Sequence, residues 1–145
     1  MPQTDTMTML VPYPAPEQKT ARTLLIALRR IAAGGLDDAS ATNLLMGSFG
    51  MGYRRPLMFL RVLMQEVSRI SQRQIRIAPC CCPRMTDGEA AILCAIDTAR
   101  SDPDLARAGL SRVTGTLDLS PAVSIAQALG DALEDLGRPI SLRTG

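Results

Sequence analysis

The sequence predicts a single all-α domain, a bundle of about five to six helices, from three observations. Aromatic residues make up only 3% of the 145 residues and Trp is absent, so the core must come from aliphatic side chains and Met. This composition favours helices over a sheet of β-branched and aromatic strands. Apolar residues also recur at helical spacing between Gly, Pro and Asp positions. The length fits one domain that buries roughly 70% of its unfolded surface.

Three helices are predicted in the first half of the chain. The first runs from about residue 17 to 33; its apolar side chains share one face, and Arg29 is expected off that face. The second is capped by Asp37 or Asp38 and carries apolar residues as far as Phe49. The third begins near Pro56, which the first turn of a helix tolerates, and continues to about residue 71.

Three more helices are predicted in the second half. Thr86 and Glu89 have the spacing of a capping box, which begins a helix that ends near residue 100. Asp102 followed by Pro103 begins a short helix, and Ser120 followed by a proline begins the last one. No repeat of fixed period is visible in the sequence.

Two short segments and the N-terminus read as extended chain. Residues 75–78 and 139–143 alternate apolar and polar side chains, and we expect them to pair as a minor two-stranded ribbon. Residues 1–16 contain four prolines and are expected to form a poorly ordered arm. Residues 17–145 then constitute the single helical domain.

The net charge of +2 is unevenly distributed. Residues 54–84 contain seven Arg against Glu66 alone, whereas residues 85–145 contain nine acidic residues against five Arg. Either the middle of the chain binds an anionic partner or the two halves attract each other in the fold. The near balance of the total favours the second interpretation.

The sequence contains no signal for export or membrane insertion. Residues 1–16 lack a basic start followed by an apolar run, and no stretch of 18 apolar residues occurs. We therefore expect a cytoplasmic protein without a membrane partner, in which the thiols are reduced.

The chemistry is concentrated in one tripeptide. Cys80, Cys81 and Cys82 lie between two prolines, and Cys94 follows in the next predicted helix. Three interpretations stay open: ligation of a soft metal (zinc, copper(I) or an iron–sulfur cluster), thiol redox chemistry, and inert packing of a tight turn. The missing C-x₂-C spacing argues against common zinc and ferredoxin sites. Arg84 and the adjoining helix N-terminus would give the thiolates electrostatic support.

Other functional classes have weaker support. Arg54 and Arg55 follow a Gly-rich segment and are candidates for contact with an anion or an acidic protein partner. Single-strand nucleic-acid binding needs stacking aromatics, which this basic stretch largely lacks. The absence of His excludes the common Ser–His and Cys–His arrangements, so no catalytic residue is assigned and a non-enzymatic role is expected.

Three segments resemble a known group. They are Met51–Pro56, Pro79–Thr86 with its Pro-Cys-Cys-Cys-Pro-Arg-Met-Thr motif, and Leu136–Pro139. The sequence is similar to an uncharacterised family of short bacterial proteins, known as a domain of unknown function, from about residue 10 onward. The resemblance implies a bacterial single-domain protein but supplies no activity, cofactor or partner.

The leading hypothesis is a small helical protein whose cysteines 80, 81, 82 and 94 bind a soft metal or cluster, or report redox state. The alternative is a non-catalytic adaptor or regulatory module with structural cysteines. Such a module would bind an acidic partner, or a second copy of the chain, through Arg54, Arg55 and the face of the third helix.

Overall fold

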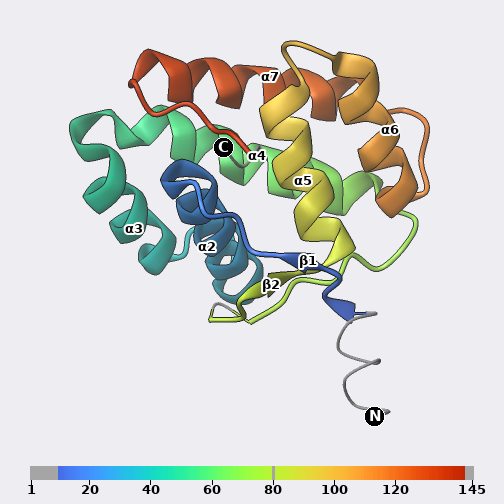
Figure 1. Ribbon diagram of the computed structural model, residues 1–145, viewed down its shortest axis with the longest axis horizontal. Coiled ribbons are helices and arrows are strands. Elements are labelled where there is room, and N and C mark those ends of the chain that lie inside the picture. Colours follow the sequence, from blue (N-terminus) through green and yellow to red (C-terminus); the bar gives the residue numbers. More distant parts are fainter. Residues whose placement is uncertain (1–9, 80, 143–145) are drawn as a thin grey trace.

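The computed structural model describes residues 10–79 and 81–142, and its fold is the predicted all-α single domain with a minor ribbon (Figure 1). An antiparallel ribbon pairs strand β1 with strand β2. The elements in chain order are β1 (Tyr13–Pro14), α2 (Lys19–Gly34), α3 (Ala39–Phe49), the 3₁₀ helix η1 (Gly50–Tyr53), α4 (Arg54–Ile70), β2 (Arg84–Met85), α5 (Asp87–Thr98), α6 (Pro103–Thr114) and α7 (Ser120–Asp135).

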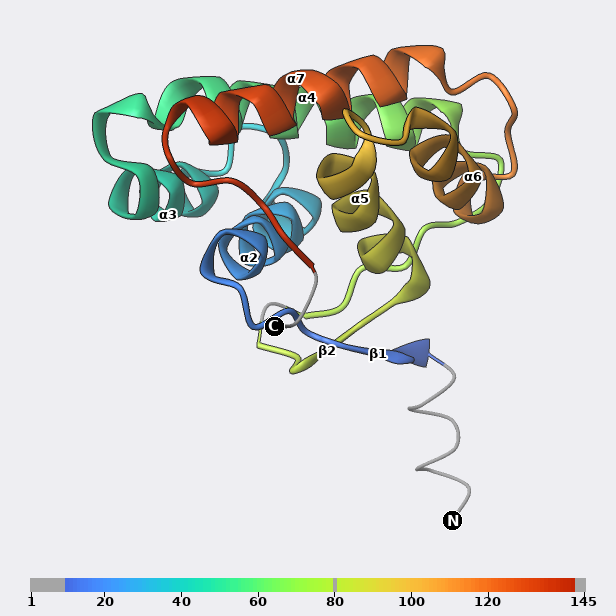
Figure 2. The same ribbon diagram turned by 45° about the horizontal axis from the view of Figure 1, so that its top comes forward.

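The helices form two layers, as Figure 2 shows. Helices α4 and α7 lie side by side in one layer, and the pairs α2–α3 and α5–α6 pack beneath them. The ribbon lies on the far side of α2 and α5 from that layer. One apolar core connects the helices, and among its fully buried members are Leu24, Leu60, Leu93 and Leu129. Within the described ranges, no helix is long and apolar enough to cross a lipid bilayer.

The helix ends follow the capping signals in the sequence. Backbone N–H groups of the first turn donate to the side chains of Asp38 in α3, Thr86 in α5 and Asp102 in α6. These bonds satisfy donors that have no partner inside the helix. Gly35 ends α2 and Gly115 ends α6 with φ angles of 97° and 76°, which favour glycine. The predicted helices are therefore confirmed, with ends shifted by a few residues.

The ribbon is present, but its strands are not the predicted ones. It pairs Tyr13 with Met85 and Pro14 with Arg84, whereas residues 75–78 and 139–142 form no strand. Ile75 and Ile77 pack against the core instead. In the C-terminal segment, the Ser141 N–H donates to the Gln18 side chain and the Leu142 N–H donates to the Asp97 carboxylate. Side chains thus accept the backbone N–H groups that would otherwise donate to a neighbouring strand. Residues 143–145 lie outside the described residues.

The N-terminal segment contacts the domain from residue 10 onward. Residues 1–9 of the predicted arm lie outside the described residues. Val11 is buried, and the Ala15 N–H donates to the Pro83 carbonyl. The guanidinium of Arg84 donates to the carbonyls of Val11 and Pro12 at 2.8 and 2.7 Å. Together these contacts hold β1 beside β2.

Gly88 allows the chain at Ile75 and Arg76, which precedes β2, to pack closely against the first turn of α5. A Cβ atom at Gly88 would lie 2.6 Å from Cγ2 of Ile75 and 3.4 Å from the Arg76 carbonyl oxygen. We expect Gly88→Ala to displace this segment and to lower the free energy of unfolding by about 1–3 kcal/mol, measured by urea denaturation followed by circular dichroism.

Gly109→Ala is the matched control, because a Cβ atom there in α6 meets no atom within 4 Å. The alanine should raise stability by about 1 kcal/mol through helix propensity alone. Equal effects of the two substitutions would contradict the close packing at Gly88.

Candidate functional site

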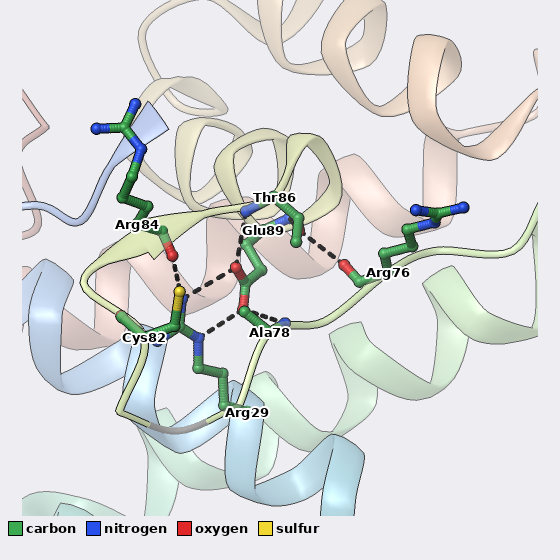
Figure 3. A network of polar contacts seen from close by, with 7 residues as sticks. All are labelled: Arg29, Arg76, Ala78, Cys82, Arg84, Thr86 and Glu89. Atoms are coloured by element: carbon green, nitrogen blue, oxygen red, sulfur yellow. Dashed lines mark hydrogen bonds and ion pairs between the residues drawn. The ribbon is translucent and has the colours of Figure 1, made fainter. Parts of the chain in front are cut away.

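A buried ion pair joins α2 to α5 beside the turn formed by residues 79–82, which we call the cysteine turn. The side chains of Arg29 and Glu89 are 2% and 0% exposed. Arg29 Nε lies 2.6 Å from Glu89 Oε2, and Nη2 lies 3.1 Å from Oε1. Figure 3 shows this bidentate arrangement, in which two parallel N–H groups of the guanidinium face both oxygens of one carboxylate. Such paired, charge-assisted hydrogen bonds are among the strongest and most geometrically specific in proteins.

Glu89 also binds two backbone groups on either side of the cysteine turn. Its Oε2 accepts from the Ala78 N–H at 3.2 Å, before the turn. Its Oε1 accepts from the Thr86 N–H at 2.9 Å, after the turn. The carboxylate therefore holds the two ends of the segment 78–86 at a fixed separation.

Arg29 binds the same segment through its carbonyl groups. Nη1 donates to the Cys82 carbonyl at 2.9 Å and Nη2 donates to the Arg84 carbonyl at 2.7 Å (Figure 3). The guanidinium thus places the strand β2 and the end of the turn against α2. Burial of a charged side chain is costly unless its polar atoms are paired, and these contacts provide that pairing.

Thr86 completes the network with a reciprocal capping box. Its hydroxyl oxygen accepts from the Glu89 N–H at 3.1 Å, while the Glu89 carboxylate accepts from the Thr86 N–H. The same hydroxyl donates to the Arg76 carbonyl at 2.7 Å. The predicted capping box is confirmed, and it additionally anchors the chain that leads into the cysteine turn.

The cysteine turn lies directly beside this network. The Cys82 N–H donates to the Pro79 carbonyl at 3.1 Å, which closes a four-residue turn. Cys81 is exposed and Cys82 is half-buried, whereas Cys80 lies outside the described residues. The structure therefore places the Cys81 side chain at the protein surface, on a segment whose backbone is fixed from both sides.

Cys94 lies about two turns further along α5 and is half-buried. Its carbonyl accepts from the Thr98 hydroxyl at 2.7 Å. In the two described ranges, no three Cys, Asp or Glu side chains are grouped as metal ligands. Cys81, Cys82 and Cys94 are thus not brought together as a ligand set within these ranges.

The sequence also singled out the side chains of Arg54, Arg55 and Arg84, and none of the hydrogen bonds described here joins them to a cysteine. Arg84 directs its guanidinium at the N-terminal segment, through the two carbonyls described above. Arg54 is exposed at the start of α4, with its guanidinium carbon 6.0 Å from the centroid of the Tyr53 ring. Arg55, also exposed, forms an ion pair with Asp135 of α7 at 3.2 Å.

Arg29 is the residue that the sequence analysis missed. It was expected off the apolar face of the first helix, yet it is buried. Its position four residues after Leu25 continues a row at i+4 spacing, which places it on the edge of that face. That spacing was the available signal. A second was Glu89, an acidic residue of the first turn that directly precedes the apolar run Ala90–Ile96.

A comparison with protein-family models matches residues 2–145 to one family, described as "Family of unknown function (DUF6628)". No curated protein and no solved structure matches the chain.

The ion pair can be tested by removing one charge and then both. Arg29→Met leaves the Glu89 carboxylate buried without its cation, so we expect the free energy of unfolding to fall by about 3–5 kcal/mol. The double variant Arg29→Met/Glu89→Leu removes both charges and should recover part of that loss. Urea denaturation of the three proteins measures both changes.

Arg55→Met is the control, because it removes an ion pair that is more than half exposed on both sides. Its cost should stay below about 1 kcal/mol. If Arg29→Met/Glu89→Leu is no more stable than Arg29→Met, Arg29 and Glu89 do not act as a pair.

Proposed function

We propose that this chain, which belongs to the DUF6628 family of unknown function, uses its cysteine turn as a thiol-redox site. The observation that supports the proposal is the exposure of Cys81 within a turn whose backbone is fixed by the buried ion pair. An exposed thiol is accessible to a dissolved oxidant, and accessibility is one of the two conditions for oxidation of a cysteine.

The proposed chemistry starts from the reduced thiols expected in the cytoplasm. The Cys81 thiolate attacks hydrogen peroxide, so that an S–O bond forms, the O–O bond breaks and hydroxide leaves to take up a proton. A second thiol of the chain then attacks the sulfenic sulfur. A disulfide forms and the oxygen leaves as water.

The second thiol is expected to come from a residue that is not the sequence neighbour of the oxidised one, since a disulfide between neighbours is strained. Cys80 and Cys82 are both neighbours of Cys81, so Cys94 is the thiol that satisfies this condition. Thiol–disulfide exchange from a Cys81–Cys94 disulfide would then lead to Cys80–Cys82 or to a pair of either with Cys94.

Peroxide titration tests the proposal directly. Reduced protein treated with one equivalent of hydrogen peroxide should lose two reactive thiols, and peptide mapping should find a disulfide that includes a cysteine of the turn. Cys81→Ser should slow the loss of thiols by about tenfold or more, because the exposed nucleophile is gone.

Cys94→Ser is the control for the first step and should leave the initial rate of peroxide consumption unchanged. Equal initial rates for wild type and Cys81→Ser would contradict the proposal. Stoichiometric zinc, copper or iron in anaerobically purified protein, lost on replacing the three turn cysteines by Ser, would favour the soft-metal alternative instead.

A second candidate function is docking of an acidic protein. It is favoured by exposed methionines in α3, η1 and α4. Met51 is 98% exposed, and Met46 and Met58 are about half exposed on the neighbouring helices. Arg54 and Arg55 lie between Met51 and Met58 in the sequence and are exposed. Flexible Met side chains next to cationic groups suit an acidic partner with apolar anchors.

A synthetic acidic amphipathic helix provides the probe for this second candidate. Its affinity should fall about tenfold in Arg54→Ala/Arg55→Ala and should decrease with added salt. Arg107→Ala, which removes an exposed arginine of α6, is the matched control. The candidate fails if the double variant and the control bind the peptide equally.

A further inference from the structure

An apolar cavity lies between α2, α4 and the segment that leads to the cysteine turn. Its volume is about 630 Å³, within the range of about 300–1,000 Å³ that is usual for small-molecule sites. Leu36, which is partly exposed, is among its lining residues. Most of its wall is aliphatic, formed by Ile31, Met64, Val67, Ile75, Ile77 and Ile92.

A second pocket of about 400 Å³ adjoins the first and has a different character. The two pockets share Arg73, Gln74 and Ile75 as a common wall. The second pocket adds Arg76 and Arg112, with Asp87 as the acidic residue of its lining. An aliphatic cavity and a predominantly cationic pocket therefore meet at Arg73.

The guanidinium of Arg73 is held in place by uncharged groups. Its Nη1 donates to the Arg112 carbonyl at 2.9 Å, near the C-terminus of α6. The side chain packs over Gly115, where a Cβ atom would lie 3.1 Å from Arg73 Nε. Among the described residues, no carboxylate forms an ion pair with Arg73. An exposed cation that donates to one backbone carbonyl, and that has no acidic partner among the described residues, thus borders the aliphatic cavity.

We infer that these adjoining pockets bind a single-chain amphipathic anion, with its aliphatic chain in the cavity and its carboxylate or phosphate head beside Arg73. Burial of the chain against the aliphatic wall supplies affinity, since apolar area leaves water. The guanidinium supplies orientation, because it presents donors in a planar fork that matches carboxylate and phosphate oxygens.

This ligand class fits the site better than a purely apolar or purely ionic one. A neutral hydrocarbon would make no use of the Arg73 charge beside the cavity. A small anion such as acetate would leave the aliphatic wall in contact with water. Only a molecule with both parts uses the two pockets together.

Isothermal titration calorimetry of the reduced full-length chain tests the inference. The probes are decanoate and decyl phosphate, each below the concentration at which it aggregates. We expect saturable binding of at least one of them at a single site. Affinity should increase from acetate to hexanoate to decanoate, because each added CH₂ buries further apolar area. The neutral analogue 1-decanol should bind about tenfold more weakly.

Arg73→Ala should weaken binding of the anionic probe by about tenfold or more, through loss of the charged hydrogen-bond donor. The same variant should leave the affinity for 1-decanol unchanged. Arg107→Ala, an exposed arginine that lines neither pocket, is the matched control and should bind like wild type. Circular dichroism confirms that both variants are folded.

Three results would each overturn the inference. They are the absence of saturable binding by both anionic probes, equal affinity of Arg73→Ala and wild type for the anionic probe that binds, and equal affinity of the wild type for that probe and for 1-decanol. The inference concerns a site other than the cysteine thiols. Replacement of Cys81 by Ser should therefore leave the affinity for decanoate unchanged.

Discussion

A guanidinium and a carboxylate that both lie out of water need partners for their polar atoms, and in this protein the backbone supplies them. Arg29 and Glu89 satisfy each other through two hydrogen bonds and take the rest from Ala78, Cys82, Arg84 and Thr86. The desolvation cost of several kcal/mol per buried ion is offset only when such geometry is achieved. The pair therefore fixes the backbone at Ala78 and at Cys82, Arg84 and Thr86, whatever its net contribution to stability.

The position of Cys82 follows from contacts of its backbone. The contacts that fix the turn are made by the carbonyl of Cys82 and by backbone groups of its neighbours. The ribbon depends on the same pair, because Arg29 fixes the carbonyl of Arg84, and the side chain of Arg84 in turn binds Val11 and Pro12. Cys81 is exposed and lies outside the apolar core, which weakens an explanation of this residue as packing.

Local signals predicted the helices, whereas the site depends on contacts between distant residues. Capping residues such as Asp38 and Thr86 act within one turn, so their effect is readable from the sequence. The Arg29–Glu89 pair joins residues 60 positions apart, and apolar periodicity assigns a charged residue to solvent. The ribbon was placed wrongly for a related reason. Two-residue strands carry too little pattern to identify partners, and Pro14 made its segment an improbable strand.

One wall of the cavity and the cysteine turn are formed by consecutive residues of the chain. A change in the structure of one is therefore expected to affect the other. Ile75 and Ile77 form part of the cavity wall, and the next residue, Ala78, donates to Glu89. Thr86 fixes the Arg76 carbonyl between them. A displacement of Ile75 and Ile77 would therefore strain the hydrogen bonds of Arg76 and Ala78 to Thr86 and Glu89. Loss of those hydrogen bonds would in turn allow the two isoleucines to move. By linkage, if a ligand in the cavity changes the stability of the ion-pair network by a given free energy, the formed network changes the affinity for that ligand by the same free energy.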